Sequence, residues 1–301
     1  MKIFKCFGLS VLSDFDLRCV PEGPLPANSA DVVIEQGVIR SELPGSVECD
    51  GYAQVTNGQC LVTIPAVARF EITEGTNIRI DPDPEAVPLA VEAYLLGTVF
   101  GILIHQRKEY PFHASVMKGS NGGVAFTAPS GAGKSSLIAF LARSAQVSLL
   151  SDDMGRIPFD NEPEVRFHAG PRKLKLWDDA AGWLKMPKDG RQRDLARENK
   201  FHYRGSESAW IPQCKLDAIA YLKRSRDAKI KLEKVTGENA IRVVLAGIFR
   251  PTIGAIVQTE ERLFMNAARI AQSLDVYILS RPWGFEYMEE TRQSLYSADL
   301  I

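Results

Sequence analysis

The first 80 residues alternate short apolar stretches with turn residues, a pattern typical of β-strands. Val32–Ile34 and Phe70–Ile72 are two such stretches, and the apolar segment Met1–Leu12 predicts a first strand. No long apolar run ending in small residues follows that segment, so we interpret it as part of the fold and not as a secretion signal. The pattern predicts a β-rich N-terminal domain over residues 1–85.

The clearest local signal in this part is the dipeptide Asn57-Gly58. It separates the strand-like stretches Tyr52–Thr56 and Gln59–Ile64. Asn-Gly favours a two-residue hairpin turn in which both central positions have positive φ. We therefore expect an antiparallel hairpin with that turn.

Asp81-Pro-Asp-Pro84 interrupts the strand pattern, and an apolar helix is predicted from about Val87 to Gln106. Up to Ile104 this stretch has about the minimum length of a membrane span, but it contains Glu92 and lies inside a continuous folded pattern. We interpret it as a buried helix that leads a second domain, residues 86–301, and we expect no membrane association.

From residue 110 the pattern changes to strands and helices in alternation. His113–Met117 and Val124–Thr127 predict a hairpin, Ser136–Arg143 a helix, and Val147–Leu150 a buried strand. Together with the later stretches they predict an α/β fold; these stretches are Leu216–Leu222, Ala240–Phe249, Leu263–Ser273 and Val276–Leu279.

Composition narrows the class of protein. The 36 Lys and Arg residues nearly balance the 37 Asp and Glu residues, so the overall charge of a nucleic-acid-binding protein is absent. The five cysteines are odd in number and never spaced as Cys-x-x-Cys, which argues against a zinc site or a disulfide framework and favours a reducing cytoplasm. They are Cys6, Cys19, Cys49, Cys60 and Cys214.

A glycine-rich segment between the predicted strand and helix has the pattern of a phosphate-binding loop. Such loops hold a nucleoside triphosphate through convergent backbone N–H groups, a lysine on the β- and γ-phosphates and a hydroxyl on Mg²⁺. Ala128 stands where the pattern has its first glycine, and the alternative is a chance glycine-rich turn. We expect ATP and Mg²⁺ as cofactors, with the nucleotide bound by Ser130, Gly131, Ala132, Gly133, Lys134, Ser135 and Ser136.

Asp152 and Asp153 follow the predicted strand Val147–Leu150. Carboxylates at the end of a strand near such a loop can hold Mg²⁺ or accept a proton from an attacking hydroxyl. The alternative is a solvated turn that caps the next segment. His113 is a third candidate, because its strand precedes the loop by one hairpin, although a lone histidine is more often a structural residue.

In order and spacing, Phe112-His-Ala-Ser-Val, the loop Ser130–Ser135 and Leu149-Leu-Ser-Asp-Asp resemble the catalytic domain of HPr kinase/phosphorylase. The resemblance implies a P-loop kinase domain that phosphorylates serine. It also implies catalytic roles for Asp152 as general base, His113 and Lys134, with Ser135 and Asp153 at the metal.

The sequence departs from that family in two places, and in both it is similar to a divergent branch of HPr-kinase-like proteins. The glutamate-containing signature after the aspartates is absent, and His168–Trp177 stands in its place; the first 100 residues also differ from the usual N-terminal domain. The run Gly-Pro-x-x-Leu-x-Leu-Trp, the pair Asn199-Lys200 and Ser280-Arg-Pro282 resemble the kinases of lasso-peptide precursors. This branch implies a peptide substrate whose C-terminal serine is phosphorylated.

Residues 185–204 carry many basic side chains around Gly190. The segment predicts a mobile loop that closes over the nucleotide or attracts an acidic peptide, and a solvated charged loop is the alternative. The bases are Lys185, Lys188, Arg191, Arg193, Arg197, Lys200 and Arg204.

The leading hypothesis is thus a Mg-ATP-dependent serine kinase acting on a peptide or small protein. Two alternatives stay open: HPr or a small metabolite as acceptor, and a nucleotide-gated peptide-binding module without transfer activity. Assembly into a homo-oligomer also stays open.

Overall fold

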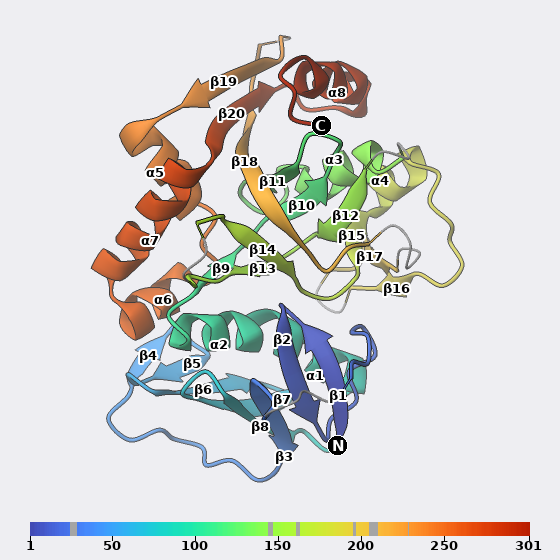
Figure 1. Ribbon diagram of the computed structural model, residues 1–301. Coiled ribbons are helices and arrows are strands. Elements are labelled where there is room, and N and C mark those ends of the chain that lie inside the picture. The colour runs from blue at the N-terminus through green and yellow to red at the C-terminus, as the bar shows by residue number, and fades with distance from the viewer. Residues whose placement is uncertain (25–28, 144–146, 161–162, 195–196, 205–209, 228) are drawn as a thin grey trace. The chain divides into compact units, whose positions relative to one another are not determined.

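The computed structural model describes residues 1–24, 29–143, 147–160, 163–194, 197–204, 210–227 and 229–301. It is a mixed α/β protein with several sheets. Its contacts divide the chain into two units. Unit 1 contains Met1–Pro111 and Ile248–Phe264, and unit 2 contains Phe112–Gly247 and Met265–Ile301 (Figure 1).

Unit 1 contains an eight-stranded sheet, formed by the residues whose pattern is typical of β-strands. Its strand order is β1-β2-β3-β8-β7-β6-β5-β4. The strands are β1 (Lys2–Cys6), β2 (Leu9–Ser13), β3 (Val32–Gln36), β4 (Val47–Cys49), β5 (Ala53–Val55), β6 (Gln59–Ile64), β7 (Ala68–Thr73) and β8 (Asn77–Pro82).

Two details of this sheet differ from the sequence expectations. The apolar N-terminal segment forms an antiparallel hairpin and not one strand, because the chain turns at Phe7 and Gly8, both with positive φ. The β5–β6 hairpin pairs as predicted, but neither Asn57 nor Gly58 has positive φ. The Thr56 hydroxyl instead closes the turn: it donates to the Gln59 carbonyl at 3.1 Å and accepts from the Gln59 N–H at 3.0 Å.

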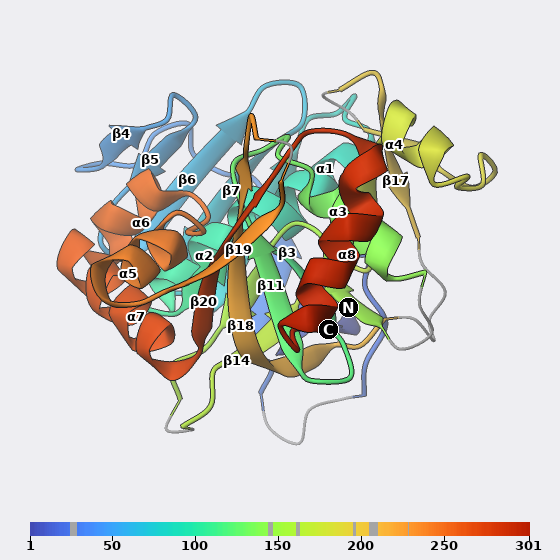
Figure 2. The same cartoon turned by 90° about the horizontal axis from the view of Figure 1, so that it is seen from above.

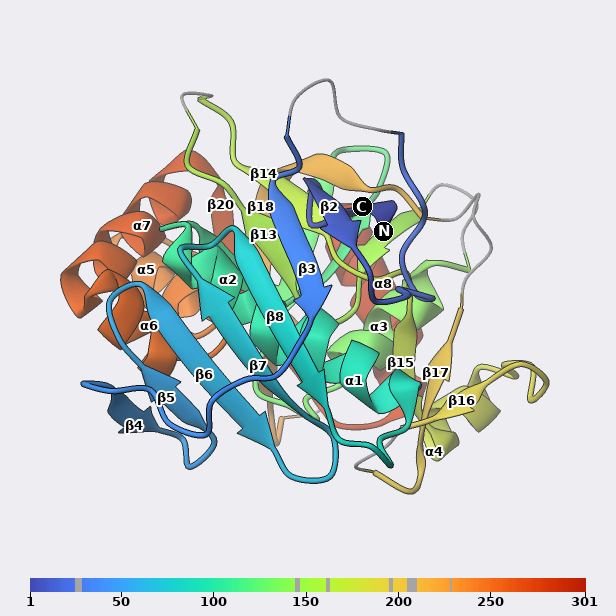
Figure 3. The same ribbon diagram turned by 90° about the horizontal axis from the view of Figure 1, so that it is seen from below.

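The predicted apolar helix is present and belongs to unit 1. It runs through α1 (Pro88–Tyr94), a π-helical turn η1 (Leu95–Val99) and α2 (Phe100–Gln106), and it lies along one face of the sheet (Figure 3). Among the described residues, this run has the length and composition of a membrane span, but 72% of its apolar window is buried inside the protein. The contacts therefore group it with the N-terminal sheet, whereas the predicted division at residue 85 placed it with the second domain.

Unit 2 is built on a mixed sheet. Its central strands lie in the order β12-β10-β11-β18-β20-β19. Strand β14 pairs with the first part of the long strand β18, and β13 pairs with β14. The strands are β10 (Ser115–Lys118), β11 (Gly123–Thr127), β12 (Ser148–Ser151), β13 (Gly155–Ile157), β14 (Arg166–Ala169), β18 (Gln213–Arg224), β19 (Lys231–Val235) and β20 (Asp275–Arg281); the short β9 (Tyr110–Phe112) precedes them.

The pairing of these strands brings several of their C-terminal ends to one edge of the sheet. Strand β11 is parallel to β18, and β18 is parallel to β20. Strand β10 is antiparallel to both β11 and β12, so β12 runs in the same direction as β11. The segments that follow β11, β12 and β20 therefore leave the sheet at the same edge.

Helices cover this sheet. Helices α3 (Lys134–Leu141) and α8 (Met288–Ser297) lie side by side and share a buried apolar cluster with Phe126, Leu222 and Leu279 (Figure 2). The described residues also form α4 (Asp178–Trp183), α5 (Gly237–Leu245), α7 (Glu260–Ser273) and the 3₁₀ turn η3 (Phe285–Tyr287), while α6 (Pro251–Gln258) belongs to unit 1. Of the four later stretches that predicted an α/β fold, 216–222 and 276–279 lie in strands β18 and β20, and 240–249 and 263–273 lie largely in helices α5 and α7.

The segment predicted as a mobile basic loop contains two strands. β16 (Gln192–Arg193) and β17 (Lys200–Tyr203) form a three-stranded sheet with β15 (Leu174–Trp177), in the order β15-β17-β16. Its many charges suggested a loop, but the register Leu174↔Tyr203 to Trp177↔Lys200 gives the backbone of this segment a hydrogen-bonded partner. Residues 195 and 196 of the segment lie outside the described residues.

Candidate active site

The glycine-rich loop connects β11 to α3, as the sequence predicted. Strand β11 is buried along its whole length, while Pro129, Ser130 and Gly131 are exposed. Gly131 and Gly133 have φ values of +85° and +90°, which residues other than glycine rarely adopt. A Cβ added at Gly131 would meet no atom within 4 Å, so the loop backbone is open on that side.

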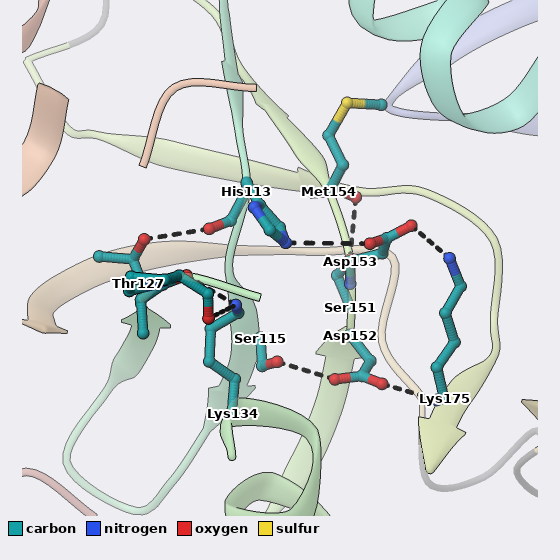
Figure 4. A network of polar contacts seen from close by, with 11 residues as sticks. His113, Ser115, Thr127, Lys134, Ser151, Asp152, Asp153, Met154 and Lys175 are labelled. Atoms are coloured by element: carbon teal, nitrogen blue, oxygen red, sulfur yellow. Dashed lines mark hydrogen bonds and ion pairs between the residues drawn. The ribbon is translucent and has the colours of Figure 1, made fainter. Parts of the chain in front are cut away.

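Lys134 begins helix α3 and is only 7% exposed. Its Nζ donates to the carbonyl oxygens of Ala128 at 2.8 Å and Pro129 at 3.4 Å. Burial lowers the pKa of Lys134, against the opposing effect of Asp152 and Asp153. The lysine is thus held inside the loop, next to the backbone that an anion would contact (Figure 4).

Asp152 follows β12 and is almost fully buried, at 4% exposure. Its carboxylate accepts from Ser115 Oγ at 2.7 Å and from the Lys175 N–H at 2.6 Å, and Ser135 is a third hydrogen-bond partner. Burial raises the pKa of Asp152 to about 6, although these hydrogen bonds oppose the rise. A carboxyl with that pKa changes its charge close to neutral pH.

Asp153 lies in a different environment although it is the next residue. Its side chain is 38% exposed and pairs with Lys175 Nζ at 2.6 Å. Burial tends to raise the pKa of Asp153, but the charge of Lys175 and its hydrogen bond outweigh this effect and hold that pKa below its usual range. Asp153 is therefore an anion over the whole neutral range.

His113 lies between β9 and β10, and its Nε2 is 4.0 Å from Asp153 Oδ1. Its backbone is fixed on both sides: its N–H donates to Gly247 at 2.7 Å, and its carbonyl accepts from Thr127 Oγ1 at 3.1 Å. Burial and the Lys134 charge lower the pKa of His113 to about 4. The imidazole is neutral at pH 7.

The structure thus brings the sequence-predicted residues together. Figure 4 shows Lys134, His113, Asp152 and Asp153 gathered at the sheet edge described above. Asp152 is also a hydrogen-bond partner of Ser135, the residue after the loop lysine.

Sequence reasoning missed Ser115 and Lys175 as members of this network. The charged Lys175 inside the otherwise apolar run Leu174–Trp177 was a signal that could have been used. Ser115 gave none, because a serine inside a strand has no distinctive pattern. Both lie on strands that only the tertiary fold brings next to Asp152.

In segment 185–204, Lys200 lies close enough to Asp152 and Asp153 to interact with them electrostatically. Its Nζ also lies 5.8 Å from the ring centroid of Trp177, whose side chain is exposed. Burial, Lys175 and Arg197 lower the pKa of Lys200. Arg191 instead makes local contacts, with Asp178 at 3.0 Å and over the Phe201 ring.

No group of three or more His, Cys, Asp and Glu side chains suited to a metal occurs in the described parts of the chain. A cation here would therefore take only a few protein ligands, which is how proteins usually hold Mg²⁺ together with substrate phosphates and water.

No protein-family model matches the chain, and no curated protein matches it. Among solved structures it is similar to the Hpr(Ser) kinase/phosphatase from Coxiella burnetii, at 10% sequence identity and a TM-score of 0.33. The superposition covers 62% of this chain and 95% of that chain. Both the identity and the TM-score are low.

Proposed function

We propose that this protein is a Mg-ATP-dependent kinase that transfers the γ-phosphoryl group to a serine hydroxyl of a peptide or small protein. One observation carries the proposal: an open glycine-rich loop with its buried Lys134 and a pair of unlike carboxylates meet at one sheet edge. Phosphoryl transfer needs positioning, positive charge near the phosphates and a group that accepts the hydroxyl proton.

The loop fits a triphosphate. Its backbone is open at Gly131, and the N-terminus of α3 supplies free N–H groups and a positive dipole end. The Lys134 ammonium group donates hydrogen bonds to two loop carbonyls, and phosphate oxygens would be stronger acceptors for it. The proposed nucleotide-binding residues remain Ser130 to Ser136.

The oxygen ligands of the site fit magnesium. Ser135 and Asp153 would hold it, and the ion would supply charge neutralisation on the phosphates. The hydrogen bond between Ser135 and Asp152 is consistent with this fit, since it places the serine hydroxyl beside the acid pair. Asp153 is suited to a metal because it is anionic at every physiological pH.

We assign the general base to Asp152. Its pKa of about 6 gives a carboxylate that is charged at pH 7 and still basic enough to accept a proton. Exposure argues for the opposite assignment, because Asp153 is 38% exposed and Asp152 only 4%. Basicity decides for Asp152, because the low pKa of Asp153 makes Asp153 a poor base.

We propose His113 as a catalytic residue that acts without charge. A neutral imidazole near Asp153 can orient that carboxylate or donate a hydrogen bond to a phosphate oxygen.

The leading acceptor is the C-terminal serine of a lasso-peptide precursor, as the motif resemblance implies. Exposed Trp177 with Lys200 and Arg197 near its ring would suit a peptide with acidic and apolar side chains.

The experiment is mass spectrometry of candidate acceptors after incubation with protein, ATP and Mg²⁺. We expect a mass gain of one phosphate on serine-terminated peptides, localised by fragmentation. Lys134→Ala should lower the rate of phosphoryl transfer by at least about 1000-fold, because the positive charge of the lysine beside the β- and γ-phosphates is lost. The fold should survive, since the ammonium group bonds only to its own loop among the described residues.

Lys188→Ala, at an exposed position of the basic segment, is the matched control. Undiminished turnover by Lys134→Ala would contradict the proposal. Phosphate on HPr or a metabolite, and none on peptides, would reassign the acceptor. Tight ATP binding without transfer to any acceptor would favour a peptide-binding module.

A further inference from the structure

Arg281, at the C-terminal end of β20, is a buried cation that comes from outside the glycine-rich loop. It is only 5% exposed. Its Nη1 donates to the Met288 sulfur at 3.4 Å. No carboxylate pairs with it anywhere in the part of the chain that the structure describes.

Such a placement is unfavourable without an anion. A thioether is a weak hydrogen-bond acceptor, and a guanidinium group has five N–H donors to satisfy. Burying the charged group costs desolvation free energy, and pairing with an anion offsets this cost. Burial lowers the pKa of Arg281.

The guanidinium group lies against the glycine-rich loop. A Cβ added at Gly133 would lie 2.9 Å from Arg281 Nη2. Gly133 immediately precedes Lys134 and has a φ of +90°, so the close approach and the backbone conformation both require glycine. The arginine side chain therefore reaches the loop backbone at the start of α3.

The sheet topology explains how a residue so late in the chain reaches this loop. Strands β11, β18 and β20 are parallel neighbours, so Arg281 and the residues that follow Thr127 leave the sheet at the same edge. Lys134 comes to the loop from its own helix, and Arg281 comes from a strand two positions away. The two cations thus flank the loop from different elements.

We propose that Arg281 is a phosphate-binding residue of the nucleotide site. Its guanidinium group donates to phosphate oxygens of the nucleotide held by the loop, alongside Lys134. The inference rests on the proposed function and adds to it a ligand contact from outside the loop. An arginine suits this role because its planar group can bind two phosphate oxygens at once.

The test measures both nucleotide binding and stability in the variant Arg281→Met. Methionine fills the site with an unbranched side chain but carries no charge. The binding constants of Mg-ATP and Mg-ADP are measured by calorimetry, and the melting temperature is measured without nucleotide. We expect binding to weaken by about 10- to 100-fold, the range of lost charge-assisted hydrogen bonds. The melting temperature without nucleotide should stay the same or rise, because a buried unpaired charge is removed.

Arg226→Met, at an exposed position after β18, removes the same charge and serves as the control. If Arg281 only holds helix α8 through Met288, Arg281→Met will melt earlier and bind nucleotide as the wild type does, and the inference is then overturned. Should Arg281→Met fail to fold, Arg281→Gln keeps a donor for Met288 and is judged by the same binding criterion.

The wild-type measurement separates this inference from the proposed function. A wild-type protein that binds neither Mg-ATP nor Mg-ADP contradicts both. A wild-type protein that binds nucleotide, with Arg281 variants that bind equally well, contradicts the role of Arg281 alone.

Discussion

At the scale of single residues, Asp152 and Asp153 acquire opposite properties from their surroundings. Asp152 is enclosed and has its pKa raised to about 6, whereas Lys175 keeps the pKa of Asp153 low. Nothing in two consecutive aspartates distinguishes them, because the difference comes from strands β10 and β15. The residue pattern could predict the pair, but only the family resemblance singled out Asp152 as the base.

The pH dependence of activity follows from this difference. If Asp152 is the base, kcat/KM for ATP should fall as the pH drops below about 6, where this carboxyl becomes protonated. Ser115→Ala removes a hydrogen bond that stabilises the charged form, so the pKa of Asp152 should rise and the fall should begin about one pH unit higher.

Ser120→Ala, at an exposed position of the turn between β10 and β11, should leave the profile unchanged. A Ser115→Ala profile that coincides with the wild type, with activity retained well below pH 6, would instead assign the base to Asp153.

At the scale of elements, two glycines illustrate how packing decides the effect of the same substitution. Gly155 in β13 faces the fully buried ring of Phe167, which a Cβ would overlap. Gly155→Ala should therefore destabilise the protein by about 1–3 kcal/mol through overpacking. The free energy of unfolding in urea measures the effect.

Gly182 in α4 is the matched control, since a Cβ there would meet nothing within 4 Å. Gly182→Ala should stabilise the protein by up to about 1 kcal/mol, because alanine is the better helix former. Equal effects of the two substitutions would show that the Phe167 contact does not limit the β13–β14 pair.

The basic segment 185–204 shows where reasoning from sequence stops at this scale. Its charges and Gly190 are typical of a solvated loop, yet β16 and β17 form there. Two- and four-residue strands are too short to leave a periodic pattern, and their stability comes from pairing with β15. By contrast, the hairpin before the glycine-rich loop and the helix after it were predictable, because turn residues and an unbroken helical run mark them.

At the scale of the whole molecule, the chain returns from unit 2 to complete unit 1. Segment 248–264 supplies both partners of the buried His105 ring: the Phe249 carbonyl at 2.8 Å and the Gln258 amide at 2.9 Å. It also contributes the buried side chains Ile253 and Val257. Residues 1–111 alone therefore lack part of their own core.

We expect fragment 1–111 to be less stable than the same fragment joined to 248–264, by at least about 3 kcal/mol, because buried polar groups lose their partners and apolar burial is lost. A linker of about four residues should suffice, since the Phe249 N–H already donates to the Pro111 carbonyl at 2.9 Å. Urea unfolding of both fragments measures this, and equal midpoints would argue against a structural role for the returning segment.

The sequence by itself determined what depends on neighbouring residues: the β-rich first part, the apolar helix, and the glycine-rich loop with its lysine between a strand and a helix. Tertiary structure alone decided what depends on distant segments meeting. Tertiary packing brought Ser115 and Lys175 to the aspartates and Arg281 to Gly133, and it also set the pKa of Asp152. The physical reason is that local pattern fixes backbone conformation, whereas burial and charge at a site come from residues far apart in the chain.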